Sequence, residues 1–328
     1  MKKMNLKLFI VFAMLMLAGG VLAITIESKE QDIQLDKNKG YFKGNVKVQV
    51  GDVVVESPRA DLDIEPATKK PSLATFFDKP YAKQIKGNKK HEVKADIIEV
   101  SLIKKIITAK GNTQTNVLED KKPTIIITAD EQEYDTNTHL MKATGSVVIN
   151  YEDMTATSDT GYALMDKQGD VHNIKLVSHA TIKQDKSFIK GDLIQYSKQK
   201  QDITVSGNTM SDVTFENGDR VIVTARNQQY DRRSSMIMAN GTVNVKYADY
   251  VAVGPKALVY INKQTNKPEK IVFQGRSKIT QKNVNSVEAD RIIMIVNPKK
   301  FEATGHVKTI IEQDTSSDKQ NDKMEFSL

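Results

Sequence analysis

A turn centred on glycine recurs along the chain at a nearly constant spacing, and this repeat limits the folds that the chain can adopt. In each copy the glycine is followed by one polar residue and then by Val, Thr or Ser. The glycines are Gly44, Gly111, Gly145, Gly207, Gly241, Gly275 and Gly305. The steps that end at Gly145, Gly241 and Gly275 are equal in length, and the step that ends at Gly305 is slightly shorter. Such a chain stacks one supersecondary unit on the next.

The steps that end at Gly111 and Gly207 are about twice as long as the others, so each holds two periods. We therefore predict further turns, without glycine, near Asp78-Lys79 and near Ser178-His179. The whole chain then holds about nine units of about 33 residues. A glycine at a fixed point indicates a bend or bulge that needs a positive φ or a close backbone approach. This role is structural, so we assign no ligand to the glycines.

A second marker shares this period, and it consists of a small residue followed by Asp at the start of a predicted strand. It occurs at Ala60-Asp61, Ala95-Asp96, Ala129-Asp130, Gly191-Asp192 and Ala289-Asp290. Ala225-Arg226 keeps the register with the opposite charge, and we align Ser158 and Lys256 with it in two further units. A ladder of Asp could suggest calcium, but Arg226 and Lys256 interrupt it. We interpret these Asp residues as turn formers.

The segments between the markers have the alternation of β-strands. Val46, Val48 and Val50 alternate with polar residues, and no sustained helical period follows the first segment of the chain. Short strands that turn a corner once per unit predict an all-β fold, an elongated open jelly roll or β-solenoid. The two terminal edges of such a fold must be capped or must pair with a partner strand.

The two ends of the chain differ from the repeats. Residues 1–23 read as a signal peptide, with Lys2, Lys3 and Lys7 before an apolar run and small residues up to Ala23, after which we expect cleavage. An uncleaved anchor is the alternative. Residues 24–312 are predicted to form the repeat domain, and residues 313–328 a disordered polar tail.

The sequence carries no recognisable catalytic or metal-binding constellation. The five His residues are scattered without a metal-ligand spacing, Cys is absent, and no phosphate-binding GxxxxGK[ST] motif occurs. We therefore predict that the protein is not an enzyme and holds no metal or cofactor. A net charge of +7 is compatible with an anionic partner, but the Lys residues lack the interleaved aromatics expected for nucleic-acid binding.

Tyrosine recurs four residues after the second marker. The five residues are Tyr134, Tyr162, Tyr196, Tyr230 and Tyr260, and neighbouring units have Val100 and Met294 at this position. Side chains at one position of a stacked repeat lie above one another on one face. The stripe is either a structural ladder inside the fold or an amphipathic wall that faces lipid. The two interpretations have equal support from the residues alone.

The first third of the chain resembles the periplasmic lipopolysaccharide-transport family of LptA, also called OstA. The resemblance rests on Ile24-Thr25-Ile26-Glu27-Ser28, on Lys43-Gly44-Asn45-Val46 with Ala60-Asp61, on Ala74-Thr75-Phe76, and on the segment from Ala95 to Gly111. Beyond it only the repeat pattern continues, and the chain is longer than typical members. Related proteins are the inner-membrane LptC and the N-terminal domain of the outer-membrane LptD.

The resemblance implies a β-taco that bridges the inner and outer membranes of a Gram-negative periplasm. Lipid A acyl chains would lie in a hydrophobic groove, and related domains or further copies of the chain would join head to tail by edge-strand addition. The matching groove positions are Ile24, Phe76, Val100 and Leu102, and Val100 also lies at the tyrosine position. This agreement favours the lipid wall, so Tyr134, Tyr162, Tyr196, Tyr230 and Tyr260 complete the predicted groove. Such transport would need an inner-membrane ATPase partner.

Three rival interpretations stay open on the residues. A structural or adhesive β-solenoid would have a dry core, with the tyrosine stripe fully buried. An LptC-like protein would keep its signal segment as a membrane anchor. A polysaccharide lyase on a parallel β-helix would need an exposed cluster of Asp, Arg and Lys, which we do not find in the sequence.

Overall fold

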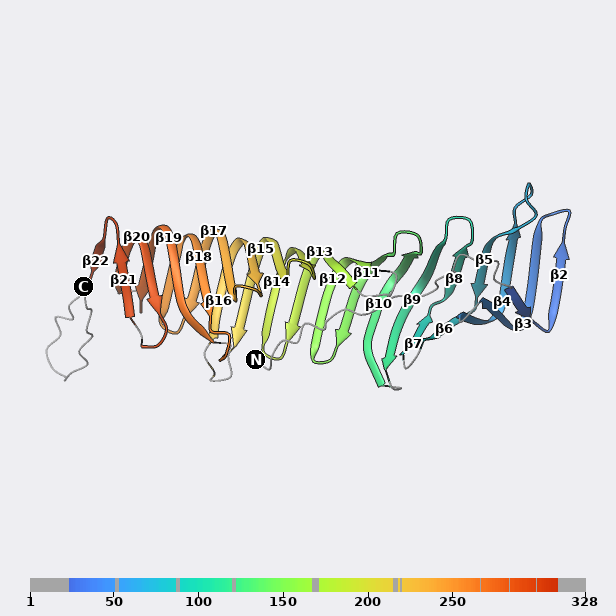
Figure 1. The fold of residues 1–328 in the computed structure, drawn as a ribbon, viewed down its shortest axis with the longest axis horizontal. Coiled ribbons are helices and arrows are strands. Elements are labelled where there is room, and N and C mark those ends of the chain that lie inside the picture. The colour runs from blue at the N-terminus through green and yellow to red at the C-terminus, as the bar shows by residue number, and fades with distance from the viewer. Residues whose placement is uncertain are drawn as a thin grey trace. The chain divides into compact units, whose positions relative to one another are not determined.

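A computed structural model describes residues 24–311 except 51–52, 87–88, 120–121, 167–170, 215–217, 219, 266, 283 and 299. The predicted signal peptide of residues 1–23 and the predicted tail of residues 313–328 lie outside the described residues. Every regular element in the described part is a β-strand, β1 to β22 (Figure 1). None of the described residues forms a helix that could cross a membrane. The predicted all-β class is confirmed.

The chain divides into two compact units, which meet in the sequence between Ile182 and Lys183. We call them the N-terminal unit and the C-terminal unit. The strands of the N-terminal unit are β1 (Ile24–Glu27), β2 (Glu30–Gln34), β3 (Lys39–Val50), β4 (Val53–Ile64), β5 (Pro71–Phe77), β6 (Tyr81–Lys86), β7 (Lys89–Lys94), β8 (Ile97–Ser101), β9 (Ile106–Glu119), β10 (Lys122–Asp135), β11 (Leu140–Tyr151), β12 (Met154–Met165) and β13 (Val171–Gln184). Those of the C-terminal unit are β14 (Ser187–Ser197), β15 (Asp202–Thr214), β16 (Arg220–Asp231), β17 (Met236–Tyr247), β18 (Tyr250–Ile261), β19 (Pro268–Gln281), β20 (Asn285–Ile295), β21 (Lys300–Thr304) and β22 (Lys308–Ile310).

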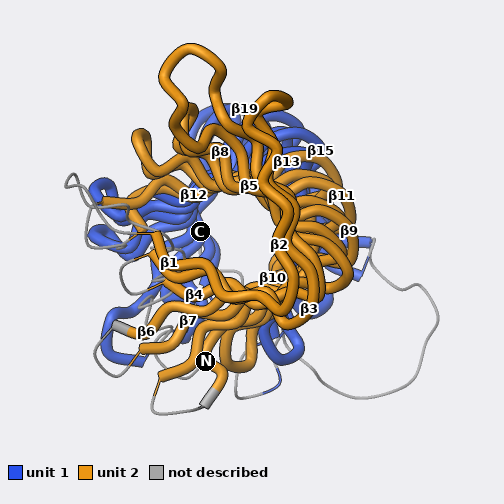
Figure 2. Tube along the Cα trace, turned by 90° about the vertical axis from the view of Figure 1, so that its right-hand side faces the viewer, with its two compact units in different colours: residues 1–4, 183–328 blue, residues 5–182 orange. Residues whose placement is uncertain are grey.

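From β9 to β12 in the N-terminal unit, and from β14 to β20 in the C-terminal unit, each long strand pairs antiparallel with the next. β10, for example, pairs with β9 and with β11, and β17 pairs with β16 and with β18. Every long strand also bends at its middle, so that its two halves form opposite walls. Figure 2 shows the strands of the N-terminal unit curving around a common centre. The repeat is therefore a hairpin of two bent strands.

The bend explains the recurring glycine. Gly145 has a φ of 78° and Ser146 a φ of 48°, a conformation that an L-residue other than glycine adopts only with strain. The carboxylate of Asp130 on the neighbouring strand lies against Gly145, and a Cβ atom added there would overlap it. The second marker thus packs directly on the first, which is why the two share one period.

The Asp of the marker also hydrogen-bonds the residue after the glycine of the next strand. Asn112 Nδ2 donates to Asp96 Oδ2 over 2.8 Å, and a ring nitrogen of His306 lies 2.6 Å from Asp290 Oδ2. These Asp side chains are turn formers, as the sequence indicates. No group of three or more His, Asp or Glu that could hold a metal occurs among the described residues.

The predicted turns without glycine are present. Asp78 and Lys79 have φ values of 64° and 63°, and Ser178 and His179 have φ values of 62° and 51°. His179 Nδ1 lies 2.9 Å from Asp159 Oδ2, the same contact that other turns make. The repeat therefore persists where its most visible residue is lost.

We expect Ser178→Gly to raise the stability of the protein, because glycine adopts a positive φ without the cost of about 1 kcal/mol that other residues bear. The measurement is the midpoint of urea unfolding of a protein that comprises residues 24–328. Ser206→Gly is the control: Ser206 lies inside β15 at an ordinary φ, so glycine there should destabilise by about 0.5–1 kcal/mol. Equal effects of the two substitutions would contradict the role of backbone strain.

The bend also changes which residues face the interior. In β10, Ile125, Ile127 and Ala129 are buried, and after the turn residue Asp130 the buried positions are Gln132 and Tyr134. Pairing with β9 skips Asp130 on β10 and both Gly111 and Asn112 on β9, so two residues oppose one in a β-bulge, and Asp130 is the bulge residue of its own strand. The buried residues of β10 have odd numbers before Asp130 and even numbers after it, so the alternation shifts by one residue there. Because the strand bends at that same point, both halves point their buried side chains inward.

Candidate functional site

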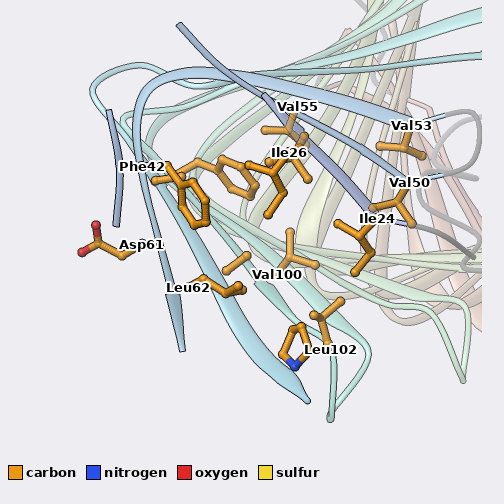
Figure 3. Close-up of a pocket in the computed structure, with 15 residues that line it drawn as sticks. Ile24, Ile26, Phe42, Val50, Val53, Val55, Asp61, Leu62, Val100 and Leu102 are labelled. Carbon is orange, nitrogen blue, oxygen red and sulfur yellow. The ribbon is translucent and has the colours of Figure 1, made fainter. Parts of the chain in front are cut away.

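The N-terminal unit encloses an apolar cavity of about 220 Å³ near its first strands. Apart from Asp61, every residue that lines it is apolar: Ile24, Ile26, Phe42, Val48, Val50, Val53, Val55, Ala60, Leu62, Pro71, Ala74, Phe76, Val100 and Leu102. The carboxylate of Asp61 points away from the other labelled side chains (Figure 3). The predicted groove residues Ile24, Phe76, Val100 and Leu102 thus line one cavity, although they come from strands and loops far apart in the sequence.

Cross-strand pairing positions these residues. Leu62 of β4 pairs with Ala74 of β5, and Ala74 pairs with Val100 of β8. Directly paired residues of antiparallel strands lie on the same face. This row forms one wall of the cavity, and Val48 and Val55 on the other halves of β3 and β4 belong to the opposite wall. The cavity therefore lies between the two walls of the bent sheet.

Tyr134 lies on the same inner row, farther along the N-terminal unit. The pairings run from Val100 to Ile107, then to Tyr134 and then to Met141. The Tyr134 side chain is 1% exposed, and its hydroxyl lies 3.2 Å from His139 Nδ1. Burial raises the pKa of Tyr134 to about 12. At this position tyrosine fills the interior with a partnered hydroxyl.

The C-terminal unit has an apolar cavity of its own, of about 120 Å³. Tyr230 lines it together with Ile203, Ile237, Val259 and Ile271, and these residues pair in one row across β15 to β19. Tyr196 of β14 begins this row because it pairs with Ile203. Tyr196 and Tyr230 therefore share the inner face, as the predicted stripe requires.

Burial raises the pKa of both the Tyr196 and the Tyr230 hydroxyl, and the positive charge of Arg232 opposes that rise. Arg232 belongs to the loop that joins β16 to β17. The positive charge of Arg232, at the ends of the strands, therefore acts on the hydroxyl groups of these inner tyrosines, whereas their rings lie along the apolar row.

Tyr162 and Tyr260 do not belong to this stripe. Tyr162 borders a cavity of about 40 Å³, but it pairs with the exposed Lys142, and its ring centre lies 5.9 Å from Lys175 Nζ. Tyr260 pairs with Lys270, whose Nζ lies 4.6 Å from the ring centre. By their pairing, both tyrosines lie on the other face of the sheet from the inner row that holds Tyr134, Tyr196 and Tyr230.

The cause is a shift of one residue in the alignment of the second marker. The bulged residues of β12 and β18 are Asp159 and Pro255, not Ser158 and Lys256. Four positions on from them lie Ala163 and Val259, which pair with the inner residues Met141 and Ile237. A shift of one residue moves a side chain to the opposite face. In β12 the signal was present, because Ser158-Asp159 is itself a small residue followed by Asp.

The sequence reasoning missed a buried polar cluster that ties β9 to β10. Gln132 Nε2 donates to Thr113 Oγ1 over 2.8 Å, and Thr115 Oγ1 donates to Gln132 Oε1 over 2.8 Å. Thr113 Oγ1 in turn donates to the Ala129 carbonyl over 2.7 Å. All three side chains are at most 2% exposed. The cluster spans the bend, so it holds the two walls at a fixed angle.

The same cluster recurs in the C-terminal unit. Gln228 Nε2 donates to Thr209 Oγ1 over 2.9 Å, and Ser211 Oγ donates to Gln228 Oε1 over 2.6 Å. Gln228 and Ser211 also line the cavity of that unit. The signal in the sequence was the pattern Gly-Asn-Thr-x-Thr or Gly-Asn-Thr-x-Ser, which starts at Gly111 and at Gly207.

We expect Gln132→Ala to destabilise the N-terminal unit by about 2 kcal/mol, because it leaves Thr115 with a buried hydroxyl that has lost its acceptor. Gln114→Ala is the control, since Gln114 bonds Asn116 outside the cluster and should cost less than about 0.5 kcal/mol. Urea unfolding of both variants measures the difference. Replacing Thr113 and Thr115 by Val together with Gln132→Leu should restore much of the loss. A triple variant as unstable as Gln132→Ala would contradict this account.

Comparison with known proteins bears on the first part of the chain. Residues 25–125 match the family described as LptA/(LptD N-terminal domain) LPS transport protein. The chain is also similar to a solved structure, that of LptH, the LptA homologous periplasmic component of the conserved lipopolysaccharide transport device from Pseudomonas aeruginosa. That likeness has 12% sequence identity and a TM-score of 0.33, and it covers 38% of this chain and 83% of LptH. No curated protein matches the chain. The part of the chain that matches this family, residues 25–125, holds the cavity residues from Ile26 to Leu102.

Proposed function

We propose that the protein binds lipopolysaccharide by its acyl chains inside the bent sheet and carries it across the periplasm to the outer membrane. The observation that supports this most directly is the apolar cavity where Ile24, Phe76, Val100 and Leu102 meet. Each methylene group moved from water into such an interior contributes about 0.8 kcal/mol. Several acyl chains are therefore held firmly without a directional contact.

The proposed path includes the C-terminal unit, which has an apolar cavity and an inner row that begins with Tyr196. Both units offer the acyl chains the same kind of surface, so lipid binds each with similar affinity and can pass along. No step of this passage makes or breaks a covalent bond, and the chain acts as a carrier rather than an enzyme. Energy comes from an ATPase partner at the inner membrane.

The proposed partners are related domains that add a strand at an edge. In the described residues β1 and β2 pair with β3 on one side, and β22 pairs with β20 on one side. Ile33 is 51% exposed at the first edge, and Ile310 is 43% exposed at the last. Unpaired backbone groups beside exposed apolar side chains favour β-strand addition. We propose that these edges join the inner-membrane and outer-membrane members of the pathway, or a second copy of this chain.

Photocrosslinking in living cells tests the proposal. A photoreactive residue at Val100 and at Tyr196 should form an adduct with lipopolysaccharide, because both positions lie on the inner rows. The same residue at Tyr260, which is a tyrosine of the outer face, should form none. Adducts at Val100 alone would confine the path to the N-terminal unit. The absence of adducts at both inner positions, with the protein present and exported, would contradict lipid carriage and leave a dry structural solenoid.

A further inference from the structure

The loops at one end of the strands in the C-terminal unit carry six exposed cations and no carboxylate in their described residues. The loops are residues 198–201, 232–235 and 262–267, and the cations are Lys198, Lys200, Arg232, Arg233, Lys263 and Lys267. We call this set the basic rim. The loops at the other end of the same strands have both signs in the described residues, with Asp185, Lys186, Asp249 and Lys282. The charge is therefore concentrated at one of the two ends.

Hydrogen bonds between successive loops hold the basic rim together. Arg233 donates a side-chain hydrogen bond to the Gln199 carbonyl of the preceding loop, and Lys263 Nζ donates to the Arg233 carbonyl over 2.9 Å. Each loop lies two strands beyond the previous one, which corresponds to a spacing of about 10 Å. The cations thus form a row that runs across the strands.

The carboxylates next to these loops accept hydrogen bonds from the loop backbone and from a neighbouring strand. Asp231 Oδ1 accepts the backbone N–H groups of Arg233 and Ser234, and Asp202 Oδ2 accepts from Gln229 Nε2. Hydrogen bonding to Ser234 and to the turn lowers the pKa of Asp231, which keeps that carboxylate in its turn-forming state. Lys200, Arg232 and Lys267 are exposed, so their side chains can donate hydrogen bonds to an anion from outside.

The basic rim borders the apolar cavity. Ile261 and Pro268 both line the cavity, and they flank the loop that carries Lys263 and Lys267. Arg232 acts electrostatically on the hydroxyls of Tyr196 and Tyr230, which lie on the inner row. The apolar interior is thus followed by tyrosine hydroxyls and then by cations. An anionic amphiphile has the matching order, with apolar chains, a polar region and a charged head group.

The N-terminal unit has a similar arrangement, except that its loop of residues 65–70 also holds Glu65. Pro71 and Leu102 line the cavity of about 220 Å³, and they adjoin Lys69-Lys70 and Lys104-Lys105 in the loops at the same end of the strands. The next loop joins β10 to β11 and lies beside the loop from β8 to β9 (Figure 1), where Thr136 N donates to the Lys105 carbonyl. This loop, residues 136–139, has no Lys or Arg and lies beside the smaller cavity of about 40 Å³. Of the three cavities described above, the two larger ones, of about 220 Å³ and 120 Å³, thus have cations in the adjoining loops.

We propose that the basic rim binds the phosphate groups of a lipid whose acyl chains lie in the adjoining cavity. The inference rests on the proposed function and adds an orientation to it: the head group leaves the interior at this end of the strands and not at the other. Arg and Lys suit this role because their charged hydrogen bonds to phosphate oxygens are the strong ones. Cations in successive loops, about 10 Å apart, also offer a displaced phosphate another partner close by.

The test compares two triple variants of the mature chain with equal changes of charge. One replaces Lys200, Arg232 and Lys267 by Gln, and the control replaces Lys186, Lys246 and Lys278, which are exposed away from the basic rim. The probes are lipopolysaccharide with a doubly phosphorylated lipid A and its dephosphorylated form. We expect the first triple variant to bind the phosphorylated probe about tenfold more weakly than the wild type. The affinity of the control variant for the phosphorylated probe should change by less than about twofold. Neither triple variant should differ from the wild type in its affinity for the dephosphorylated probe.

Each contrary outcome has a distinct meaning. Equal losses in the two triple variants would show a net-charge effect and overturn the basic rim, and so would a loss that persists with the dephosphorylated probe. Inorganic phosphate bound as tightly as the lipid would make the rim a site for free anions and would also overturn the proposal. A wild type that binds neither lipid probe would contradict the proposed function itself.

Discussion

Ala74→Phe should weaken lipopolysaccharide binding by about fiftyfold while the protein stays folded. Ala74 lines the cavity between Leu62 and Val100, so a phenyl ring there occupies space that acyl chains would otherwise fill. Exclusion of about three methylene groups from the interior costs about 2.4 kcal/mol, which corresponds to the expected change in affinity. The measurement is a titration of residues 24–328 with fluorescent lipopolysaccharide.

Thr75→Phe is the matched control for this experiment. Thr75 is the next residue of β5, and it pairs with Asp61 and Glu99 on the outer face. The same ring is thereby placed on the other side of the same strand, where binding should not change. Urea unfolding of both variants establishes that each is folded. Unchanged affinity in a folded Ala74→Phe protein would mean that the cavity of the N-terminal unit does not hold the lipid.

Gly145→Ala should destabilise the N-terminal unit by about 2–4 kcal/mol, for two reasons that act together. A residue with a Cβ atom pays about 1–2 kcal/mol for the positive φ of this position. The added methyl group also overlaps the Asp130 carboxylate, so the bulge must shift and lose packing. Equilibrium unfolding in urea measures the change in the free energy of unfolding.

Two further variants separate these causes. Gly161→Ala is the control, because its Cβ would meet Val147 Cγ1 at 3.6 Å and Leu176 Cδ2 at 3.7 Å, which are ordinary contacts, and its φ is not positive. We expect Gly161→Ala to change the free energy of unfolding by less than about 1 kcal/mol. The double variant Gly145→Ala with Asp130→Ala removes the overlap and should regain part of the loss. Equal destabilisation by Gly145→Ala and Gly161→Ala would show that the turn imposes no special demand.

The sequence predicts the repeat well because the bend makes local demands that do not depend on distant residues. A positive φ and a close approach from the neighbouring Asp together require glycine, so a glycine such as Gly145 or Gly207 marks the position of the bend in the sequence. Even Ser178 and His179 could be identified, since the period alone fixes where the turn must come. The groove residues Phe76 and Val100 could be named because a family resemblance covers them.

The direction of each tyrosine could not be predicted as safely. It depends on which single residue is bulged, and pairing with both neighbouring strands decides that. Pro255 takes the bulged position in β18, where no Asp marks it, and the count from Lys256 therefore ended on the wrong face at Tyr260. Gln132 and Gln228 were missed for another reason. Their side chains read as surface residues until the Thr or Ser partners on the adjacent strand are known.

The pairing of strands that lie near one another in the sequence has a consequence for how the chain folds during its synthesis. Among the described residues the strand pairings join nearby parts of the sequence, and even Tyr250 and Gln281, at the open ends of their hairpin, are separated only by β18, β19 and one short loop. Loop closure over such short distances is fast, and chains with local contacts fold sooner than chains with distant ones. A segment that has left the ribosome can therefore close its hairpins before the rest of the chain has been synthesised. Each finished hairpin is then the template on which the next one forms.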